Sequence, residues 1–357
     1  MRELLDEPLA GHTTMRVGGP AARMVVAETA DELVDAVREV DDAGEPLLLL
    51  GGGSNLVLPD AGFEGTVVKV GTRGVRVDSS DSCGGAAVVV AAGEPWDELV
   101  ARAVDEEWSG VEALSGIPGS TGATPVQNVG AYGQEVAQTV ARVRVWDRVE
   151  QRVRTMTNLD CRFTYRHSLF KGSDRYVVID VMFQLVLGSL SRPVAYADLA
   201  TQLDVEVGAR VPLVEAREAV LAQRRRRGMV LDALDHDTWS CGSFFTNPVL
   251  SAEEFAGLEA RVAERLGAGT PSPPRFPDAA GRVKTSAAWL IERAGFGKGY
   301  GAPGPATLST KHTLAVTNRG HASASDVLAL AREVRDGVRE AFGVTLVNEP
   351  VVVGAVL

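Results

Sequence analysis

The segment at residues 115–133, SGIPGSTGATPVQNVGAYG, constrains the fold of this chain most strongly. It contains five glycines and has neither a helical nor a strand period, and it is too long for a simple turn. Long irregular segments in compact proteins are usually functional. Gln127 and Asn128 add amide donors and acceptors. We therefore expect the segment to lay backbone donors against a large, flat, polar ligand; an irregular structural loop is the alternative.

A second glycine-rich motif, GGGSN at 51–55, follows the leucine run at 47–50. Three consecutive glycines let backbone N–H groups converge on an anion, and Ser54 or Asn55 can add a donor. The motif matches neither GxGxxG nor GxxxxGK[ST], so a glycine-rich turn between strands is the alternative. Two glycine motifs that follow apolar segments suggest a dinucleotide with two phosphates, either flavin or nicotinamide.

Length and composition indicate a globular protein of two or three domains, with 357 residues, 45% apolar and 23% charged. The net charge of −11 argues against nucleic-acid or anionic-membrane binding. Cys83, Cys161 and Cys241 form no CxxC motif, so neither a disulfide framework nor a metal site is indicated. No apolar run approaches the ~20 residues of a membrane span, and no signal-peptide pattern is present. We expect a reduced, cytoplasmic protein.

The hydrophobic pattern predicts a mixed α+β fold in which strands and helices do not alternate strictly. Strands are expected at 22–27, 46–50, 66–70, 88–92, 140–146, 176–186 and 344–353. Helices are expected at 29–43, 96–107, 213–227, 252–266, 286–294 and 325–342. Ser325 is the expected N-cap of the last helix.

Several polar residues outside the glycine motifs are candidates for chemistry. Arg166 in YRH can hold a carboxylate through a bidentate fork, or it is an ordinary surface arginine. Ser243 in CGSFFTN lacks the second glycine of the GxSxG hydrolase motif, which favours a turn serine. Glu349 interrupts an apolar segment, so it is either exposed at an edge or turned into a pocket. The arginines at 224–227 end a helix, where they are either solvated or clamp a phosphate.

Six motifs, taken in order, carry a resemblance to a known family. They are GGGSNLVLPDAGFEG at 51–65, SGIPGSTGATPVQNVGAYGQEV at 115–136, YRHSLFK at 165–171, GSFFTNP at 242–248, KTSAAWLIERAGF at 284–296 and LVNEPVVVG at 346–354. The chain resembles the UDP-N-acetylenolpyruvoylglucosamine reductases, the MurB-type flavoenzymes of peptidoglycan precursor synthesis, over residues 13–354. The resemblance implies NADPH-dependent reduction of UDP-N-acetylglucosamine enolpyruvate to UDP-N-acetylmuramate through non-covalent FAD.

The resemblance also implies an FAD-binding domain of the vanillyl-alcohol-oxidase (PCMH) type in two lobes, followed by an α+β substrate-binding domain. The first lobe would comprise 1–70, closed by the C-terminal strand 344–357, and the second 71–205. The UDP-sugar-binding domain would comprise 210–343. The expected flavin-binding residues are Gly51, Gly52, Gly53, Ser54, Asn55, Ser115, Gly116, Ile117, Pro118, Gly119, Gly122, Ala123, Gln127, Asn128, Gly130, Ala131, Tyr132 and Gly133.

Three catalytic residues follow from the resemblance by motif. Arg166 and Glu349 would stabilise the enolate that forms when hydride reaches C3 of the enolpyruvyl group, and Ser243 would give the proton to C2. The segment RPVAYADLA at 192–200 resembles the closing loop of one subtype, so Tyr196 is expected to close over the nucleotide. Further expected substrate contacts are Tyr165, Arg227, Asn247 and Lys284.

The sequence departs from the family pattern at two places. Pro350 directly follows Glu349, and the stretch GMVLDALDHDTWSC after Arg227 is longer than usual. Cys241 is expected to be a buried small apolar residue. The alternative functions are another FAD-dependent oxidoreductase of the same fold, such as an alcohol or sugar oxidase, or an inactive nucleotide-sugar-binding protein. The glycine motifs contain no histidine or cysteine, which disfavours covalent flavin. We expect a monomer whose partners are small molecules.

Overall fold

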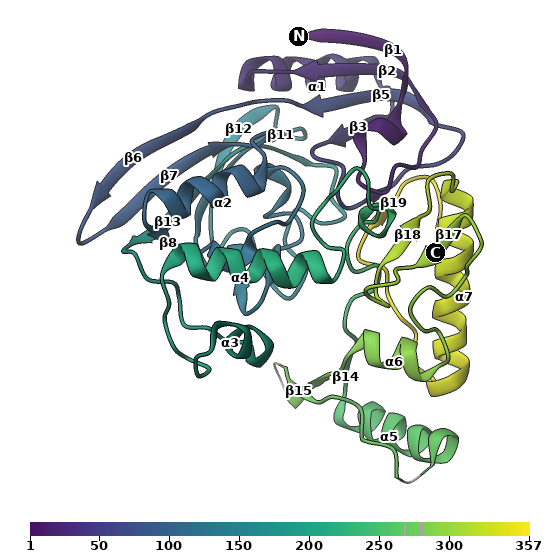
Figure 1. Cartoon of the computed structure of the whole chain (residues 1–357). Coiled ribbons are helices and arrows are strands. Elements are labelled where there is room, and N and C mark those ends of the chain that lie inside the picture. The colour runs from purple at the N-terminus through teal and green to yellow at the C-terminus, as the bar shows by residue number, and fades with distance from the viewer. Residues whose placement is uncertain (268, 279–280) are drawn as a thin grey trace. The chain divides into compact units, whose positions relative to one another are not determined.

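The computed structural model describes residues 1–267, 269–278 and 281–357, and the chain divides into two compact units. Unit 1 comprises Met1–Pro8, Pro20–Gly53 and Phe63–Val230; unit 2 comprises Leu9–Gly19, Ser54–Gly62 and Leu231–Leu357. Both units contain helices and strands (Figure 1), which confirms the predicted α+β class. The chain passes from unit 1 to unit 2 inside the GGGSN motif, between Gly53 and Ser54.

The first sheet of unit 1 contains β1 (Arg2–Pro8), β2 (Pro20–Ala27), β5 (Phe63–Val70) and β3 (Leu47–Leu50), in that order. β5 runs parallel to β2 and β3, whereas β1 is antiparallel to β2. Helix α1 (Ala30–Ala43) starts at Thr29, whose side chain accepts a hydrogen bond from the Glu32 N–H. Leu33 and Val37 on its apolar face are fully buried. The predicted strand–helix–strand start is confirmed.

The second sheet of unit 1 is antiparallel and has the main order β12-β11-β13-β7-β6. Its strands are β6 (Val75–Asp81), β7 (Gly85–Ala91), β11 (Val140–Asp147), β12 (Arg152–Thr157) and β13 (Tyr176–Leu187), with β8 (Trp108–Ser109) paired to β13. Helix α2 (Trp96–Asp105) buries Trp96 against Phe183 of β13. Helix α4 (Leu213–Arg226) lies beside α2, and the short α3 (Ala197–Leu203) packs on α4 (Figure 1).

Unit 2 is built around three helices, α5 (Ala252–Leu266), α6 (Ala287–Arg293) and α7 (Ala324–Phe342). Val327, Val334 and Val338 of α7 share one core with Phe255 and Leu290. Met15, Val17 and Val57 belong to the same core, although they precede the helices by about 200 residues or more. Unit 2 therefore depends on three separate stretches of the chain.

The remaining elements are short. The strands are β4 (Leu56–Val57), β9 (Gly130–Ala131), β10 (Gln134–Glu135), β14 (Val249–Leu250), β15 (Phe276–Pro277), β16 (Val283–Lys284), β17 (Ala306–Leu308), β18 (Val316–Asn318) and β19 (Val351–Val352). The 3₁₀ turns are η1 (Leu9–His12), η2 (Glu112–Leu114), η3 (Thr121–Ala123), η4 (Val136–Gln138) and η5 (His236–Thr238).

The expected C-terminal strand at 344–353 is wrong in its length, because only Val351–Val352 is a strand. Pro350 has no N–H to give to a ladder. The residues before it bond instead to the turn that follows Ser243: the Thr246 N–H donates to the Val347 carbonyl and the Glu349 N–H to the Phe244 carbonyl. β19 then runs parallel to β4 within unit 2.

One further expectation, the N-cap of the last helix, differs from the structure. The N-cap of α7 is Ser323, which forms a capping box with Asp326, whereas the Ser325 hydroxyl bonds to Asp60 from a distant segment. By its contacts α4 lies in unit 1, where its apolar face packs with Ala113 and Leu199; the division into two lobes and a domain at 210–343 stays a prediction. The functional names of the predicted domains remain predictions.

Candidate active site

The two glycine-rich motifs lie directly against each other in unit 1. A Cβ atom at Gly52 would lie 2.5 Å from Gly119 Cα and 2.9 Å from Ser120 N, and one at Gly51 would lie 2.5 Å from Ser120 Oγ. At Gly52 the atoms that a Cβ would meet belong to the facing backbone, so the close approach of the two backbones requires a glycine there; at Gly51 the atom met is a side-chain hydroxyl. The motifs flank a cavity of about 130 Å³ lined by Leu49, Gly51, Val70, Ala92, Ser120 and Gly122, among others.

Hydrogen bonds fix the first half of the 115–133 segment to the chain that follows β7. The Thr121 N–H donates to the Glu94 carbonyl at 2.8 Å, and the Gly122 N–H donates to the Ala92 carbonyl at 2.8 Å. On the GGGSN side, the Lys69 ammonium donates to the Gly51 carbonyl, and burial lowers the pKa of Lys69. The cavity therefore has fixed walls, and it suits a ligand that contacts backbone atoms.

The second half of the segment holds Arg166. The Arg166 guanidinium donates to the Gly130 carbonyl at 2.6 Å and lies 3.7 Å from the Glu135 carboxylate. Asn128 donates to the same carboxylate and to the Thr164 carbonyl, at 2.9 and 3.0 Å. Asn128 and Arg166 both have positive φ angles, near +50°, which indicates a backbone held by its surroundings. Arg166 therefore contacts the predicted flavin segment. Its carboxylate partner Glu135 was not among the residues predicted from the sequence.

The expected closing residue Tyr196 also lies beside this segment. Its ring makes an edge contact with Tyr132, with 6.1 Å between centroids, and a Cβ at Gly133 would lie 2.6 Å from the Ala195 Cβ. The Tyr196 residue is 53% exposed, which leaves ring surface for a ligand. Tyr165 contacts the Arg166 guanidinium, whose carbon lies 5.2 Å from the ring centroid. The roles of both tyrosines stay predictions.

In the arginine run at the end of α4, Arg227 is not the side chain that lies against the 115–133 segment. The Arg227 side chain is 41% exposed and pairs with Asp198 at 3.1 Å. Arg224 instead lies against Gly116, where a Cβ would be 3.5 Å from the arginine Nε. Sequence analysis did not single out Arg224, although its spacing from the buried residues Leu213 and Val220 places it on the apolar face of the helix.

Ser243 and Glu349 come from segments that meet in unit 2. The Glu349 N–H donates to the carbonyl of Phe244, the residue after Ser243, at 2.9 Å. Asn55 of GGGSN donates to the Glu349 carbonyl at 3.4 Å. Ser243 and Glu349 are both half-buried. Three of the predicted motifs therefore converge on one place.

The turn that carries Ser243 is anchored from both sides. The Thr14 hydroxyl donates to the Ser240 carbonyl at 2.7 Å, and the Phe244 N–H donates to the Leu314 carbonyl at 2.7 Å. Cys241 is buried, as expected, and burial raises the pKa of its thiol to about 12. Cys241 is therefore a thiol at neutral pH, which excludes it as a thiolate nucleophile.

The two other expected substrate residues lie near the start of α6. The Asn247 side-chain oxygen accepts a hydrogen bond from the Ala287 N–H at 3.0 Å, in the first turn of that helix. Lys284 lies in β16, opposite Val249 of β14. Asn247 therefore has a structural partner in α6. Contacts of Asn247 and Lys284 with the substrate remain predictions.

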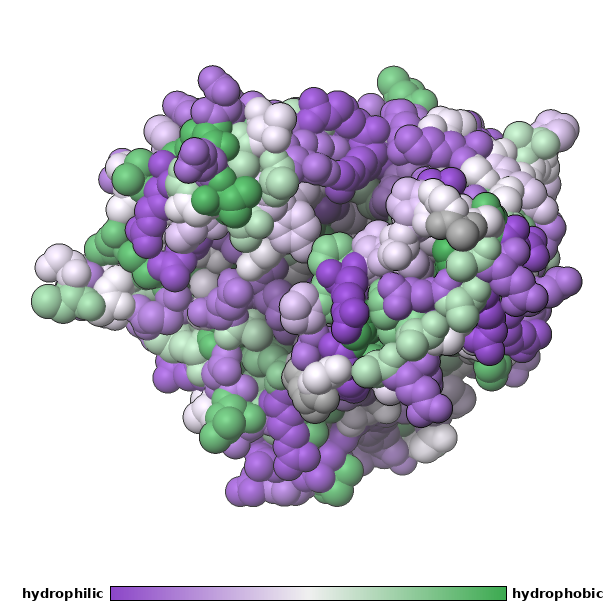
Figure 2. All heavy atoms as spheres, turned by 90° about the horizontal axis from the view of Figure 1, so that it is seen from below, coloured by the Kyte–Doolittle hydropathy of each residue, from purple (hydrophilic) through white to green (hydrophobic). Residues whose placement is uncertain are grey.

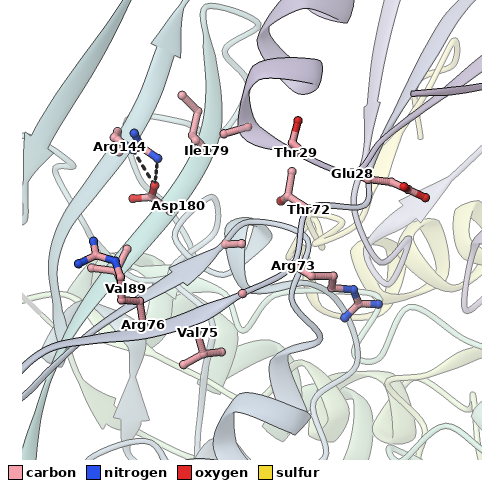
Figure 3. A pocket seen from close by; sticks show the side chains of 13 residues that line it. Glu28, Thr29, Thr72, Arg73, Val75, Arg76, Val89, Arg144, Ile179 and Asp180 are labelled. Atoms are coloured by element: carbon pink, nitrogen blue, oxygen red, sulfur yellow. Dashed lines mark hydrogen bonds and ion pairs between the residues drawn. The ribbon is translucent and has the colours of Figure 1, made fainter.

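A larger hollow, about 430 Å³, lies elsewhere in unit 1 and contains none of the expected site residues. Figure 3 shows Arg144 directed at Asp180, and these two form an ion pair. The other arginines on its wall, Arg73 and Arg76, also have carboxylate partners, Glu94 and Asp78. Each of its three arginines therefore has a carboxylate partner within the protein.

Across the described part of the chain, no group of His, Cys, Asp and Glu side chains is arranged to hold a metal ion. Within the same residues, no helix has the length and apolar character needed to cross a membrane. Hydrophilic residues predominate on the face seen in Figure 2, with apolar residues scattered among them.

Comparison with known proteins decides the family. Residues 21–156 match an FAD binding domain, and residues 233–353 match the C-terminal domain of UDP-N-acetylenolpyruvoylglucosamine reductase. The reductase of that name from Thermobifida fusca is 59% identical over 350 residues, which cover 98% of both chains. The chain belongs to the UDP-N-acetylenolpyruvoylglucosamine reductase family.

Other members of the reductase family agree with this result. The Streptomyces coelicolor reductase is 59% identical over 359 residues, covering 100% of this chain and 92% of that one. The crystal structure of the reductase from Thermus caldophilus, 24% identical, has a TM-score of 0.62 over 98% of both chains, which shows the shared fold. The chain is therefore an oxidoreductase that uses FAD and NADPH, as predicted.

Proposed function

We propose that this chain reduces UDP-N-acetylglucosamine enolpyruvate to UDP-N-acetylmuramate, with Arg166, Ser243 and Glu349 as its catalytic residues. The observation that carries the assignment is the hydrogen bond from Glu349 N–H to Phe244 O, because it joins the segments of Ser243 and Glu349. Asn55 of the flavin motif bonds to the same glutamate. A proton donor and a carboxylate are therefore held next to a cofactor motif.

The residues of the two glycine motifs, GGGSN and 115–133, fit the cofactor. The contact of Gly52 with Gly119 and Ser120 leaves no space for a side chain, and Gly51, Ser120 and Gly122 line the adjoining cavity. We propose that these residues, with the rest of segment 115–133, hold the dinucleotide. When bound, FAD accepts a hydride from NADPH and supplies it to C3 of the enolpyruvyl group.

The protein's own residues complete the reduction. As hydride reaches C3, negative charge develops on C2 and the attached carboxylate as an enolate. The Arg166 guanidinium stabilises this charge. Ser243 donates its hydroxyl proton to C2, which completes the C–C single bond. A serine is a weak acid, but the enolate is basic enough to take its proton. Glu349 stabilises the enolate by hydrogen bonding.

Separate measurement of the two half-reactions tests these roles. NADPH should bleach the flavin of the wild-type protein, and the enolpyruvyl sugar should restore its colour. Ser243→Ala should leave bleaching intact and slow the recovery by about 10²–10⁴-fold, because a positioned proton donor is lost. Glu349→Gln should slow the same step, with FAD retained. Equal slowing of both half-reactions would show that Ser243 has a structural role.

The same assay separates the alternative functions. An alcohol or sugar oxidase of this fold would regain its colour with oxygen and an alcohol, and not with the enolpyruvyl sugar. An inactive nucleotide-sugar-binding protein would not be bleached by NADPH. Identity of 59% over nearly the full length of a named reductase favours the reductase.

We also propose that the protein works as a cytoplasmic monomer on small molecules. Its cysteines are unpaired, which fits a reducing compartment. Its net charge of −11 disfavours binding to nucleic acid. Light scattering of the purified protein would give the mass in solution, and a dimer mass would contradict the monomer.

A further inference from the structure

Glu112 is a buried glutamate that the proposed reaction steps do not use. It is 2% exposed and begins η2, just before the 115–133 segment. Its Oε2 accepts a hydrogen bond from the Gly110 N–H at 2.7 Å. Its Oε1 accepts two, from the Gln134 amide at 2.9 Å and from the Arg192 N–H at 2.6 Å. All three donors are neutral groups, and a buried carboxylate is costly without them.

The carboxylate thereby joins two segments that are far apart in the sequence, both within unit 1. Gln134 directly follows the 115–133 segment, and Arg192 begins the 192–200 segment. The Gln134 side chain also accepts a hydrogen bond from the Ala113 N–H at 2.8 Å, so its amide is held at both ends. The end of the flavin segment and the start of the 192–200 segment are therefore fixed to the same side chain.

The two segments also touch directly, close to these hydrogen bonds. A Cβ at Gly133 would lie 2.6 Å from the Ala195 Cβ and 3.6 Å from Cε2 of Tyr196. The Tyr196 ring meets Tyr132 edge-on. Val194 is buried in an apolar cluster against which Tyr132 also packs. The position of the Tyr196 ring therefore depends on where the start of its segment is held.

Backbone hydrogen bonds give the 192–200 segment a local structure of its own. The Val194 N–H donates to the Ala209 carbonyl at 2.9 Å, and the Gly208 N–H donates to the Val194 carbonyl at 2.8 Å. These bonds join neighbouring stretches of the chain and do not reach the flavin segment. The bond to Glu112 is different, because it sets the position of the 192–200 segment relative to the cofactor segment.

We propose that Glu112 is a positioning residue for the UDP-sugar: by accepting the Arg192 N–H, it holds Tyr196 against the flavin-binding segment. A ligand binds less tightly when the arrangement that receives it is only part of the population. Loss of this anchor should therefore raise the dissociation constant of the UDP-sugar. The inference rests on the proposed function, because it requires that Tyr196 contacts this substrate.

A paired variant, Glu112→Gln with Gln134→Glu, removes the Arg192 contact and keeps the others. The glutamate placed at 134 can still accept the Ala113 N–H, and its second oxygen requires the amide NH₂ of the new glutamine to face it. The amide oxygen then faces the Gly110 N–H, so only the Arg192 N–H loses its acceptor. The net charge of the protein does not change.

Titration with UDP-N-acetylmuramate, the product of the proposed reaction, against the flavin absorbance of the FAD-loaded protein measures the effect. We expect the paired variant to bind this sugar about five- to fiftyfold more weakly than wild type, as for loss of a hydrogen bond to a charged group. Its FAD affinity should stay within about twofold of wild type. Glu98→Gln is the matched control, because Glu98 is exposed on α2, and it should equal wild type in both measurements.

A Tyr196→Ala background separates positioning from a general structural role. If Glu112 acts through Tyr196, the paired variant should not weaken sugar binding further once the ring is absent, whereas independent effects would multiply. Glu112→Asp keeps the test informative if the paired variant does not fold. Its shorter side chain can keep the local Gly110 contact but cannot also reach Arg192, so we expect the same pattern.

Two results would overturn this inference alone. Wild-type affinity for UDP-N-acetylmuramate in the paired variant, or in Glu112→Asp if only that variant folds, would show that the Arg192 anchor has no effect on binding. Losses that multiply with that of Tyr196→Ala would show that Glu112 does not act through the tyrosine. Failure of the proposed function looks different: wild-type protein would not bind the sugar, or Tyr196→Ala alone would bind it normally, and either result would remove this inference as well.

Discussion

The contact between the two glycine motifs makes Gly52→Ala a direct test of whether their close packing forms the cofactor site. The new methyl group would lie 2.5 and 2.7 Å from Gly119 Cα and C, and 2.9 Å from Ser120 N. Non-bonded carbon atoms prefer about 3.5–4.0 Å, so the two backbones must separate by about 1 Å. Overpacking of this kind costs about 1–3 kcal/mol. At about 2–4 °C per kcal/mol for a unit of this size, the melting temperature should fall by about 2–12 °C.

Thermal melts and FAD titration would measure the two consequences separately. Because the displaced atoms belong to the cavity wall, we expect FAD affinity to fall by about tenfold or more, in addition to the loss of stability. Gly257→Ala in α5 is the matched control, since its Cβ would meet only the Arg261 guanidinium at 4.0 Å. That change should raise stability by about 0.5–1 kcal/mol through helix propensity, with FAD affinity unchanged.

The reasoning fails if Gly52→Ala melts and binds FAD like the wild-type protein. Such a result would mean that the two motifs can separate without loss, so that close packing does not define the cofactor site. Loss of stability with full FAD affinity would limit the role of Gly52 to packing.

Three further predictions concern other parts of the chain. Tyr196→Ala should weaken UDP-sugar binding by about ten- to a hundredfold and leave FAD retention unchanged, because the ring is exposed for contact. Substrate titration against flavin absorbance measures this, and an unchanged Kd would remove Tyr196 from the closing loop. Asp147→Asn should lower the free energy of unfolding at pH 7 by about 2 kcal/mol, because hydrogen bonds from Arg175 hold the Asp147 pKa below its ordinary value. That contribution exists above about pH 4 and is lost as pH falls through the folded-state pKa, so urea melts of the variant and wild type should converge in acid; a constant difference would refute the ion-pair origin. Ser323→Ala should cost about 1 kcal/mol in urea melts and Ser323→Asn almost nothing, and equal losses would argue against the cap.

Local signals predicted some elements accurately. The bounds of α5, Ala252–Leu266, agree with the prediction because an apolar face, the Ser251 capping box and Gly267 all mark the same helix. The strand β6 was missed because its residues are mostly polar and exposed, so only its pairing with β7 makes it a strand. The C-terminal strand was overestimated because its apolar residues bond to the Ser243 turn.

The motifs of the candidate site could be predicted from the sequence, but the contacts between them could not. GGGSN and the 115–133 segment were identifiable from their glycines, but nothing local indicates that Gly52 must touch Gly119. The pairing of Arg166 with Glu135 depends on the positive φ of two residues, which the sequence does not reveal. The contact of Arg224 with Gly116 was not predicted, because tertiary packing decides which arginine of a run lies against another segment.

The three-part composition of unit 2 has a consequence for protein synthesis. Thr14 finds its partner Ser240 only after 226 further residues are made, and Asn318 bonds to Met15 across 303. At about 5–20 residues per second, the early stretch waits at least about ten seconds on the ribosome without the core it belongs to. During that time Met15 and Val17, fully buried in the finished protein, are exposed on the nascent chain. They present an apolar site that a chaperone can hold until the last third of the protein emerges.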